Sequence, residues 1–149
     1  MTTDGVPTAA RRADATLDLA QRLLAGVRAE AGRRGVALGA AVVDAGGNLV
    51  AALRMDGAQL VALPLAVDKA WTAVALNAPT ETWAASTAPG GADWGMATAL
   101  GGRLVVFAGG LPVRVDGAAV GGLGVSGAAA PVDRACAAAG LAGAGLEVP

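Results

Sequence analysis

The sequence predicts an α+β fold in which helices pack on a mainly antiparallel sheet of five strands. Short apolar runs come in pairs joined by Gly-rich turns, a pattern typical of β-hairpins. Longer stretches with apolar residues at spacings of three and four lie before, between and after these runs, as expected of amphipathic helices. The length of 149 residues suits one core. We therefore expect a single domain over 1–149, with its core at about 8–142.

The N-terminal half begins with a predicted amphipathic helix over residues 8–34. Two strands are predicted next, over 37–43 and 48–55, with Gly46 and Gly47 in the turn between them. Glycine suits this turn because a short hairpin needs positive φ angles. The apolar stripe of the helix comprises Leu17, Ala20, Leu23, Leu24, Val27 and Ala31.

The C-terminal half starts with a second predicted helix at about 60–77. An irregular stretch over 80–100 follows and holds two of the three tryptophans; its role as a lid over a ligand site stays open. Three short strands, a final helix and a frayed tail are expected after it. These elements are strands 103–107, 111–115 and 118–126, helix 131–140 and tail 143–149.

The absence of histidine excludes several classes of function. Ser-His-Asp and Cys-His catalysis, His-ligated zinc and His-ligated haem all require this residue. Cys136 is the only cysteine, so no disulfide within the chain and no cysteine cluster for a metal can form. We expect Cys136 to be a buried, inert thiol and predict no metal site.

Charge and hydropathy favour a cytoplasmic protein that binds neither nucleic acid nor membrane. The net charge is −1, and the basic residues are scattered apart from two arginine pairs. One Phe, three Trp and no Tyr leave little aromatic surface for base stacking. Although 54% of residues are apolar, many are alanines, and no run is suited to crossing a bilayer. The N-terminal residues also lack the apolar segment of a secretion signal.

The stretch GGLGVSG contains a formal G-x-G-x-x-G at Gly122, Gly124 and Gly127. A dinucleotide-binding fingerprint must lie between a strand and a helix inside a βαβ unit. Only 22 residues follow Gly127, too few to complete such a unit. We interpret the stretch as a Gly-rich strand that lets another backbone or a flat ligand approach closely.

Four charged residues are the candidates for a polar site. Asp44 ends the first strand, whereas Arg54 and Asp56 close the second. Lys69 lies on the flank of the apolar face of the next helix. A turn carboxylate, an Arg–Asp pair and a snorkelling lysine are the structural interpretations. The functional alternative is that the four converge at one edge of the sheet, where Lys69 supplies a cation or an amine of lowered pKa.

Five blocks of the sequence, taken in order, resemble one family. They are VVDAGGNLVAALRMDGA, AVDKAWTA, GGRLVVFAGGLPV, DGAAVGGLGVSGA and VDRACAAAGLA. The family is the GlcG/HbpS-like group, which includes haem-degrading and haem-binding proteins and the C-terminal domain of PduO-type proteins. The resemblance covers about 42–142. It implies a five-stranded antiparallel sheet with helices on its faces, in a homo-oligomer often of eight chains.

The same resemblance implies a ligand cleft near the strand ends and the lysine-bearing helix, with haem or a corrinoid as the ligand. This sequence departs from the pattern in having Asn48 where relatives often carry histidine. An axial bond to haem iron would therefore fall to another residue, and conventional His-ligated haem binding is not expected. The remaining candidates for that bond are Met55, Met96, Cys136 and Lys69. The residues implied to line the cleft are Lys69, Arg54, Gly109, Gly110, Gly124 and Ser126.

Three functions follow from these observations. The first, which we favour, is an oligomeric small-molecule binder in which Lys69 and Arg54 meet a carboxylate of the ligand. The second is a cofactor-independent lyase, isomerase, dehydratase or cyclase of secondary metabolism. Its catalytic residues would be Lys69, Asp44, Arg54 and Asp56. The third is a structural or interaction protein whose cleft is vestigial.

Overall fold

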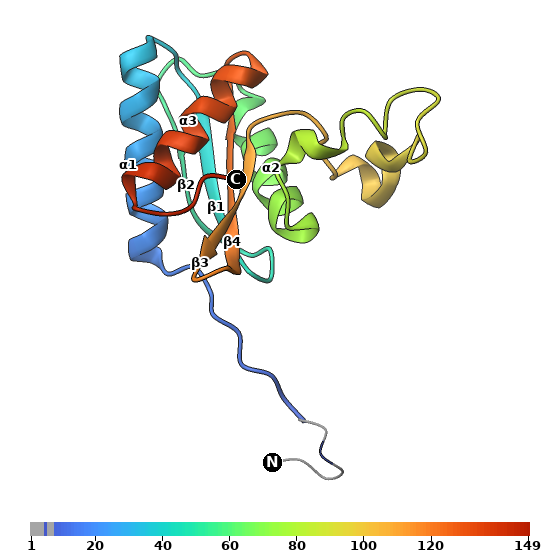
Figure 1. Cartoon of the computed structure of the whole chain (residues 1–149). Coiled ribbons are helices and arrows are strands. Elements are labelled where there is room, and N and C mark those ends of the chain that lie inside the picture. The colour runs from blue at the N-terminus through green and yellow to red at the C-terminus, as the bar shows by residue number, and fades with distance from the viewer. Residues whose placement is uncertain (1–4, 6–7) are drawn as a thin grey trace.

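The computed structural model describes residue 5 and residues 8–149. Within them, four strands form one antiparallel sheet in the order β2-β1-β4-β3 (Figure 1). The strands are β1 (Gly39–Asp44), β2 (Leu49–Arg54), β3 (Gly110–Val115) and β4 (Ala118–Ser126). The α+β class is confirmed, and the prediction of five strands is wrong.

The predicted strand at 103–107 is the one that does not form. Its backbone instead runs along helix α2 (Ala62–Leu76). The Thr72 hydroxyl accepts a hydrogen bond from Val105 N at 3.1 Å and donates to Arg103 O at 3.4 Å. Leu104 and Val105 are buried there. The Thr72 hydroxyl thus bonds two backbone groups of this apolar run that a partner strand would otherwise bond.

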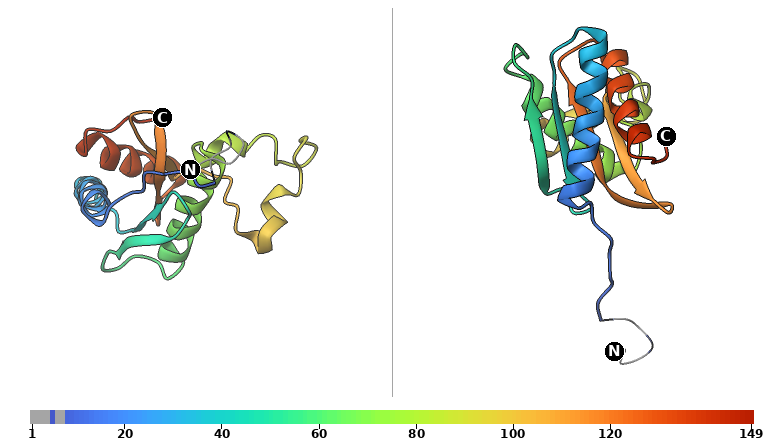
Figure 2. Two further views of the ribbon diagram at one scale, coloured as in Figure 1. Left: turned by 90° about the horizontal axis from the view of Figure 1, so that it is seen from below. Right: turned by 90° about the vertical axis from the view of Figure 1, so that its left-hand side faces the viewer.

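Helices cover both faces of the sheet (Figures 1 and 2). On one face lie α1 (Leu17–Arg34) and α3 (Ala130–Gly143), over a core of large apolar side chains. On the other face lies α2, against small residues. A Cβ on Gly124 would collide with Ala66 O, and one on Gly122 with Ala70 O. The small residues therefore let α2 lie directly on the backbone of β4.

Helix α1 begins at Leu17, not at residue 8 as the sequence analysis predicts. Thr16 has extended backbone angles, and its hydroxyl accepts a hydrogen bond from Leu19 N at 3.2 Å, which is the geometry of an N-cap. Before it, Ala15 N donates to Val120 O at 2.8 Å. Docking of this segment on β4 and the Thr16 cap together start the helix two turns later than predicted.

The connection from α2 to β3 leaves the body of the molecule (Figure 1). It contains two short 3-10 segments, η1 (Thr80–Trp83) and η2 (Met96–Gly102). No residue of η2 is buried, and Trp94 and Leu100 are exposed. We call residues 84–102 the arm.

The tail from residue 144 onward forms neither helix nor strand but contacts the body of the molecule. Arg134 Nη2 donates to Pro149 O at 2.6 Å, and Arg114 pairs with Glu147 at 3.5 Å. Leu146 packs against the core cluster. These contacts hold residues that carry no regular structure of their own.

Candidate functional site

The charged residues of the first hairpin lie at opposite ends of it. Antiparallel pairing of β1 with β2 sets Gly39 against Arg54, so Asp44 at the far end of β1 is remote from Arg54 and Asp56. The functional alternative, in which all four charged residues converge at one sheet edge, does not hold. The structure divides them among a turn, a surface depression and a buried ion pair.

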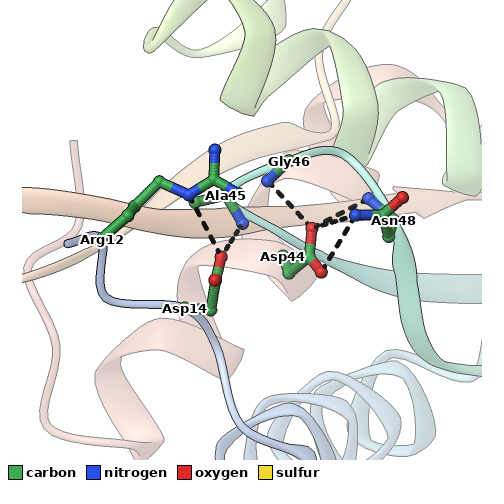
Figure 3. Close-up of polar contacts among 6 residues, drawn as sticks. All are labelled: Arg12, Asp14, Asp44, Ala45, Gly46 and Asn48. Carbon is green, nitrogen blue, oxygen red and sulfur yellow. Dashed lines mark hydrogen bonds and ion pairs between the residues drawn. The ribbon is translucent and has the colours of Figure 1, made fainter. Parts of the chain in front are cut away.

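Asp44 organises the turn between β1 and β2 (Figure 3). Its Oδ1 accepts hydrogen bonds from Gly46 N and Asn48 N, both at 2.9 Å, and from Asn48 Nδ2 at 3.1 Å. Burial would raise the pKa of Asp44, but the hydrogen bonds from Asn48 and Gly46 outweigh it and hold the pKa below its usual value. Asp44 therefore stays ionised to build the turn.

Helix α2 contacts the same turn through Trp71. Gly47 has a φ of +81°, and a Cβ there would lie 2.6 Å from Trp71 Cδ1. The Arg103 guanidinium covers the Trp71 ring at 4.1 Å from its centroid and lies 3.7 Å from Asp68 Oδ1. Gly47 thus serves both the turn and the seating of α2.

Lys69 is fully buried, although the helical pattern placed it on the flank of the apolar face. Its Nζ donates to Val125 O at 2.9 Å and to Asp133 Oδ2 at 3.1 Å. It also lies 4.9 Å from the centroid of the Phe107 ring. The second oxygen of Asp133 accepts from Ala128 N at 2.9 Å. The lysine reaches from α2, past the end of β4, to the first turn of α3.

Burial governs the protonation of this pair. Removal from water lowers the pKa of Lys69, and the nearby Asp133 carboxyl offsets only part of that change. Burial likewise raises the pKa of Asp133, against the hydrogen bond from Ala128 and the charge of Lys69. Both directions favour the uncharged amine and acid, because low dielectric penalises each ion. Neither group is held in its charged form as strongly as a surface residue would be.

The glycines implied to line a cleft pack against helix α2 instead. Gly109 has a φ of +128°, and a Cβ there would lie 2.6 Å from Lys69 Nζ. At Gly110 a side chain would meet Lys69 O and Thr80, and at Gly124 it would meet Ala66 O. Ser126 is buried and pairs with Gly39 across the sheet. Of the two interpretations of the Gly-rich strand, close backbone approach is the one the packing favours.

Two residues beside Lys69, Asp133 and Phe107, are not among the site residues that the sequence predicts. Asp133 stands in the quoted block VDRACAAAGLA, and an acidic residue in the first turn of a helix usually needs no partner beyond the backbone. The sequence pattern places Phe107 in a strand. The feature that sets Phe107 apart in the sequence is that it is the one Phe of the chain and precedes Gly109 and Gly110.

Arg54 and Asp56 lie elsewhere, on a surface depression of about 400 Å³. Leu53 and Met55 of the same chain segment contribute to it, and Arg28 reaches it from α1. We call this the Arg54 depression. It brings Arg28, Arg54 and Met55 to one surface, together with Asp56. Arg28 was not predicted, since the helical pattern only showed that it points away from the apolar stripe.

A second depression, of about 450 Å³, lies where the start of α1 meets the β3–β4 hairpin. Its lining is largely apolar and includes Asp14 and Asp116. No arginine or lysine lines it, so it suits an anionic ligand less well than the Arg54 depression does.

A family model described as haem degrading protein HbpS-like matches residues 15–142. The chain belongs to the HbpS-like family. A crystal structure of Klebsiella pneumoniae protein ORFY superposes with a TM-score of 0.92 at 31% identity, covering 95% of this chain and 99% of that one. The crystal structure of a PduOC:haem complex superposes with a TM-score of 0.86 at 34% identity, covering 92% and 99%.

A third relative is the corrinoid adenosyltransferase PduO of Citrobacter freundii, 39% identical over 92 residues. The match covers 62% of this chain but 28% of PduO, so the HbpS-like chain corresponds to a minor part of that protein. None of the helices formed by residues 8–149 combines the length and apolar character needed to cross a bilayer. In the same residues, no cluster of three or more acidic or cysteine side chains could hold a metal ion.

Proposed function

We propose that this HbpS-like protein binds a flat, carboxylate-bearing tetrapyrrole in the Arg54 depression. The observation that carries the proposal is that Arg28, Arg54 and Met55 line one depression of about 400 Å³. Guanidinium groups recognise carboxylates with two parallel hydrogen bonds. Haem carries two propionates, and a relative of the same fold forms the PduOC:haem complex.

The donor set fits haem in part. Arg28 and Arg54 suit the propionates, and Met55 is a soft sulfur donor of the kind found on haem iron. The chain has no histidine to act as the stronger ligand. We therefore expect binding at micromolar concentration or weaker, carried mainly by the carboxylates and by apolar contact with Leu53.

A haem titration followed by the Soret band tests this function. Arg54→Ala should weaken binding about tenfold or more, since a hydrogen bond to a charged group contributes about 1.5–3 kcal/mol. Arg22→Ala is the matched control, because Arg22 is exposed on the same helix as Arg28 but does not line the depression. Equal haem affinity in wild type, Arg54→Ala and Arg28→Ala would refute the assignment to this depression. Binding of a corrinoid in place of haem would replace the ligand while keeping the site.

We also propose that the arm is covered in a homo-oligomer, for which eight chains is the expectation carried by the family resemblance. The arm has no buried residue in η2, while Trp94 is 64% exposed and Leu100 67%. Two exposed large apolar side chains on a projecting segment are consistent with an interaction surface. Light scattering of wild type and of the Trp94→Ser/Leu100→Ser variant tests this, and a monomeric wild type would refute it.

The four-residue acid–base enzyme of the sequence analysis gains no support from this geometry. Asp44 is bound in a turn, Lys69 is paired with Asp133, and Arg54 with Asp56 lies at a third place. A shared reaction centre would need these groups within hydrogen-bonding reach of one substrate. Binding is therefore the function that we put forward.

A further inference from the structure

Lys69 is the only lysine of the chain; every other basic residue is an arginine. The one side-chain amine of the chain is therefore buried. The two groups differ chemically, because a guanidinium stays protonated in proteins whereas an amine can lose its proton and act as a nucleophile. An ion pair alone would not require that difference.

The surroundings of Lys69 Nζ are those of a desolvated amine next to one acid. Its contacts are the Val125 carbonyl at 2.9 Å, the Asp133 carboxyl at 3.1 Å and the Phe107 ring. Asp133 is only 2% exposed and is itself held by Ala128 N. A carboxyl group at this distance can take a proton from the amine and return it.

Phe107 lies beside this amine and also reaches the surface of the molecule. Its ring lies 4.9 Å from Nζ, yet the residue is 46% exposed. It stands on a segment without helix or strand, followed by Gly109 at a φ of +128°. The backbone at Phe107 is tied through its carbonyl to the Thr80 hydroxyl at 2.6 Å. Rotation of the side chain leaves that hydrogen bond intact, because only the backbone carbonyl takes part in it.

We propose that Lys69 is a covalent binding site for a small uncharged aldehyde, which enters where the Phe107 ring turns aside and forms an imine with Nζ. The lone pair of the neutral Nζ forms the new C–N bond as the carbonyl π bond breaks, and one of the two Nζ protons passes through Asp133 to the carbonyl oxygen to give a carbinolamine. Asp133 then delivers a second proton to that oxygen, the C–O bond breaks, and water leaves. Asp133 recovers its proton from the amine nitrogen, so no oxidant, reductant or cofactor is needed.

The electrostatics of the pair support this chemistry independently of the geometry. Burial lowers the pKa of Lys69 and raises that of Asp133. A larger share of the amine is then unprotonated and nucleophilic, and a larger share of the acid is protonated and able to donate. The apolar ring above Nζ favours an uncharged ligand over a carboxylate. This site is separate from the Arg54 depression and does not rest on the proposed tetrapyrrole binding.

The test is reductive trapping of the folded protein with benzaldehyde and cyanoborohydride, followed by peptide mass spectrometry. Any adduct on a side-chain amine is assigned without ambiguity, because Lys69 is the only lysine. The N-terminal amine serves as an internal reference for the reagent. We expect benzylation at Lys69 in wild type, loss of that adduct in Lys69→Arg, and slower trapping in Asp133→Asn. Phe107→Ala should speed trapping about tenfold or more, corresponding to a barrier lowered by about 1.4 kcal/mol.

Phe107→Ala keeps the proposal falsifiable even where variants of the buried pair fail to fold, since Phe107 is exposed. If the N-terminal amine is fully modified while Lys69 stays unmodified in wild type and in Phe107→Ala, the pair is structural only. Trapping at Lys69 that rises in parallel with global unfolding in mild urea would overturn the proposal as well. Full modification of Lys69 in denaturant shows that the reagent reaches any lysine that becomes exposed.

Discussion

Lys69 and Asp133 join helices on opposite faces of the sheet, with Nζ and Oδ2 3.1 Å apart beyond the end of β4. Neither side chain has appreciable access to water. A buried ion pair is costly to break but contributes little net stability, because the loss of hydration opposes the attraction. The main effect of the ion pair is therefore to set the position of α2 relative to α3, and its net contribution to the free energy of unfolding is small.

Removal of one member of this pair should destabilise the protein more than removal of both charges. Lys69→Met leaves the Asp133 carboxyl buried without its partner and should lower the free energy of unfolding by about 3–5 kcal/mol. In the double variant Lys69→Met/Asp133→Asn, an uncharged amide keeps the acceptor for Ala128 N. We expect it to recover about 2 kcal/mol or more of that loss. Urea unfolding of wild type, both single variants and the double variant measures the four values; equal losses in Lys69→Met and the double variant would contradict the prediction.

The pair should also make stability depend on pH. The raised pKa of Asp133 contributes stability that is present at acidic pH and is lost as pH rises through that pKa. The lowered pKa of Lys69 contributes stability that is present above the ordinary lysine pKa and is lost as pH falls through the lowered value. The free energy of unfolding of wild type, relative to that of the double variant, should therefore be lowest between these two pKa values. Unfolding curves from about pH 4 to about pH 10 check this; a difference that stays constant over the range would refute it.

The contact of β4 with α2 predicts a large effect of one methyl group. Gly124→Ala would place a Cβ on Ala66 O, so α2 must shift, and we expect a loss of about 3 kcal/mol or more, at or beyond the usual range for overpacking. Gly32→Ala is the control, since Gly32 lies in α1 with open space around it. That change should raise the free energy of unfolding by up to about 1 kcal/mol through helix propensity. Similar effects at the two glycines would show that α2 does not lie on the backbone of β4.

The role of the arginines in ligand binding can be separated from hydrophobic contact. Haem dimethyl ester lacks the carboxylates but keeps the ring, so its affinity should be the same in wild type and in the Arg28→Ala/Arg54→Ala variant. Free haem should bind the variant about tenfold or more weakly than it binds wild type. Both affinities are measured by absorbance. If the variant weakens the binding of both ligands equally, the lost affinity comes from packing and not from the propionates.

Local patterns were enough for most of the secondary structure. β4 has the limits that the sequence predicts, and α2 and both strands of the first hairpin differ by a residue or two. Two predictions failed where a contact remote in sequence decided the outcome. The Thr72 hydroxyl bonds Arg103 O and Val105 N, and no strand forms at 103–107. Ala15 binds the backbone of β4 just before the Thr16 cap, so residues 8–16 do not extend α1.

For the candidate site, the sequence determined the chemistry available: no histidine, a single lysine and a Gly-rich strand. The tertiary structure decided which groups meet. The antiparallel register puts Asp44 and Arg54 at opposite ends of β1, and periodicity within a helix cannot show how deeply the end of a long side chain is buried. Lys69 finds Asp133 64 residues later in the chain, because small residues on β4 let α2 approach the sheet and α3 begins at the end of that strand. Composition limits what a chain can do, but the distance between two side chains depends on packing that involves every element between them.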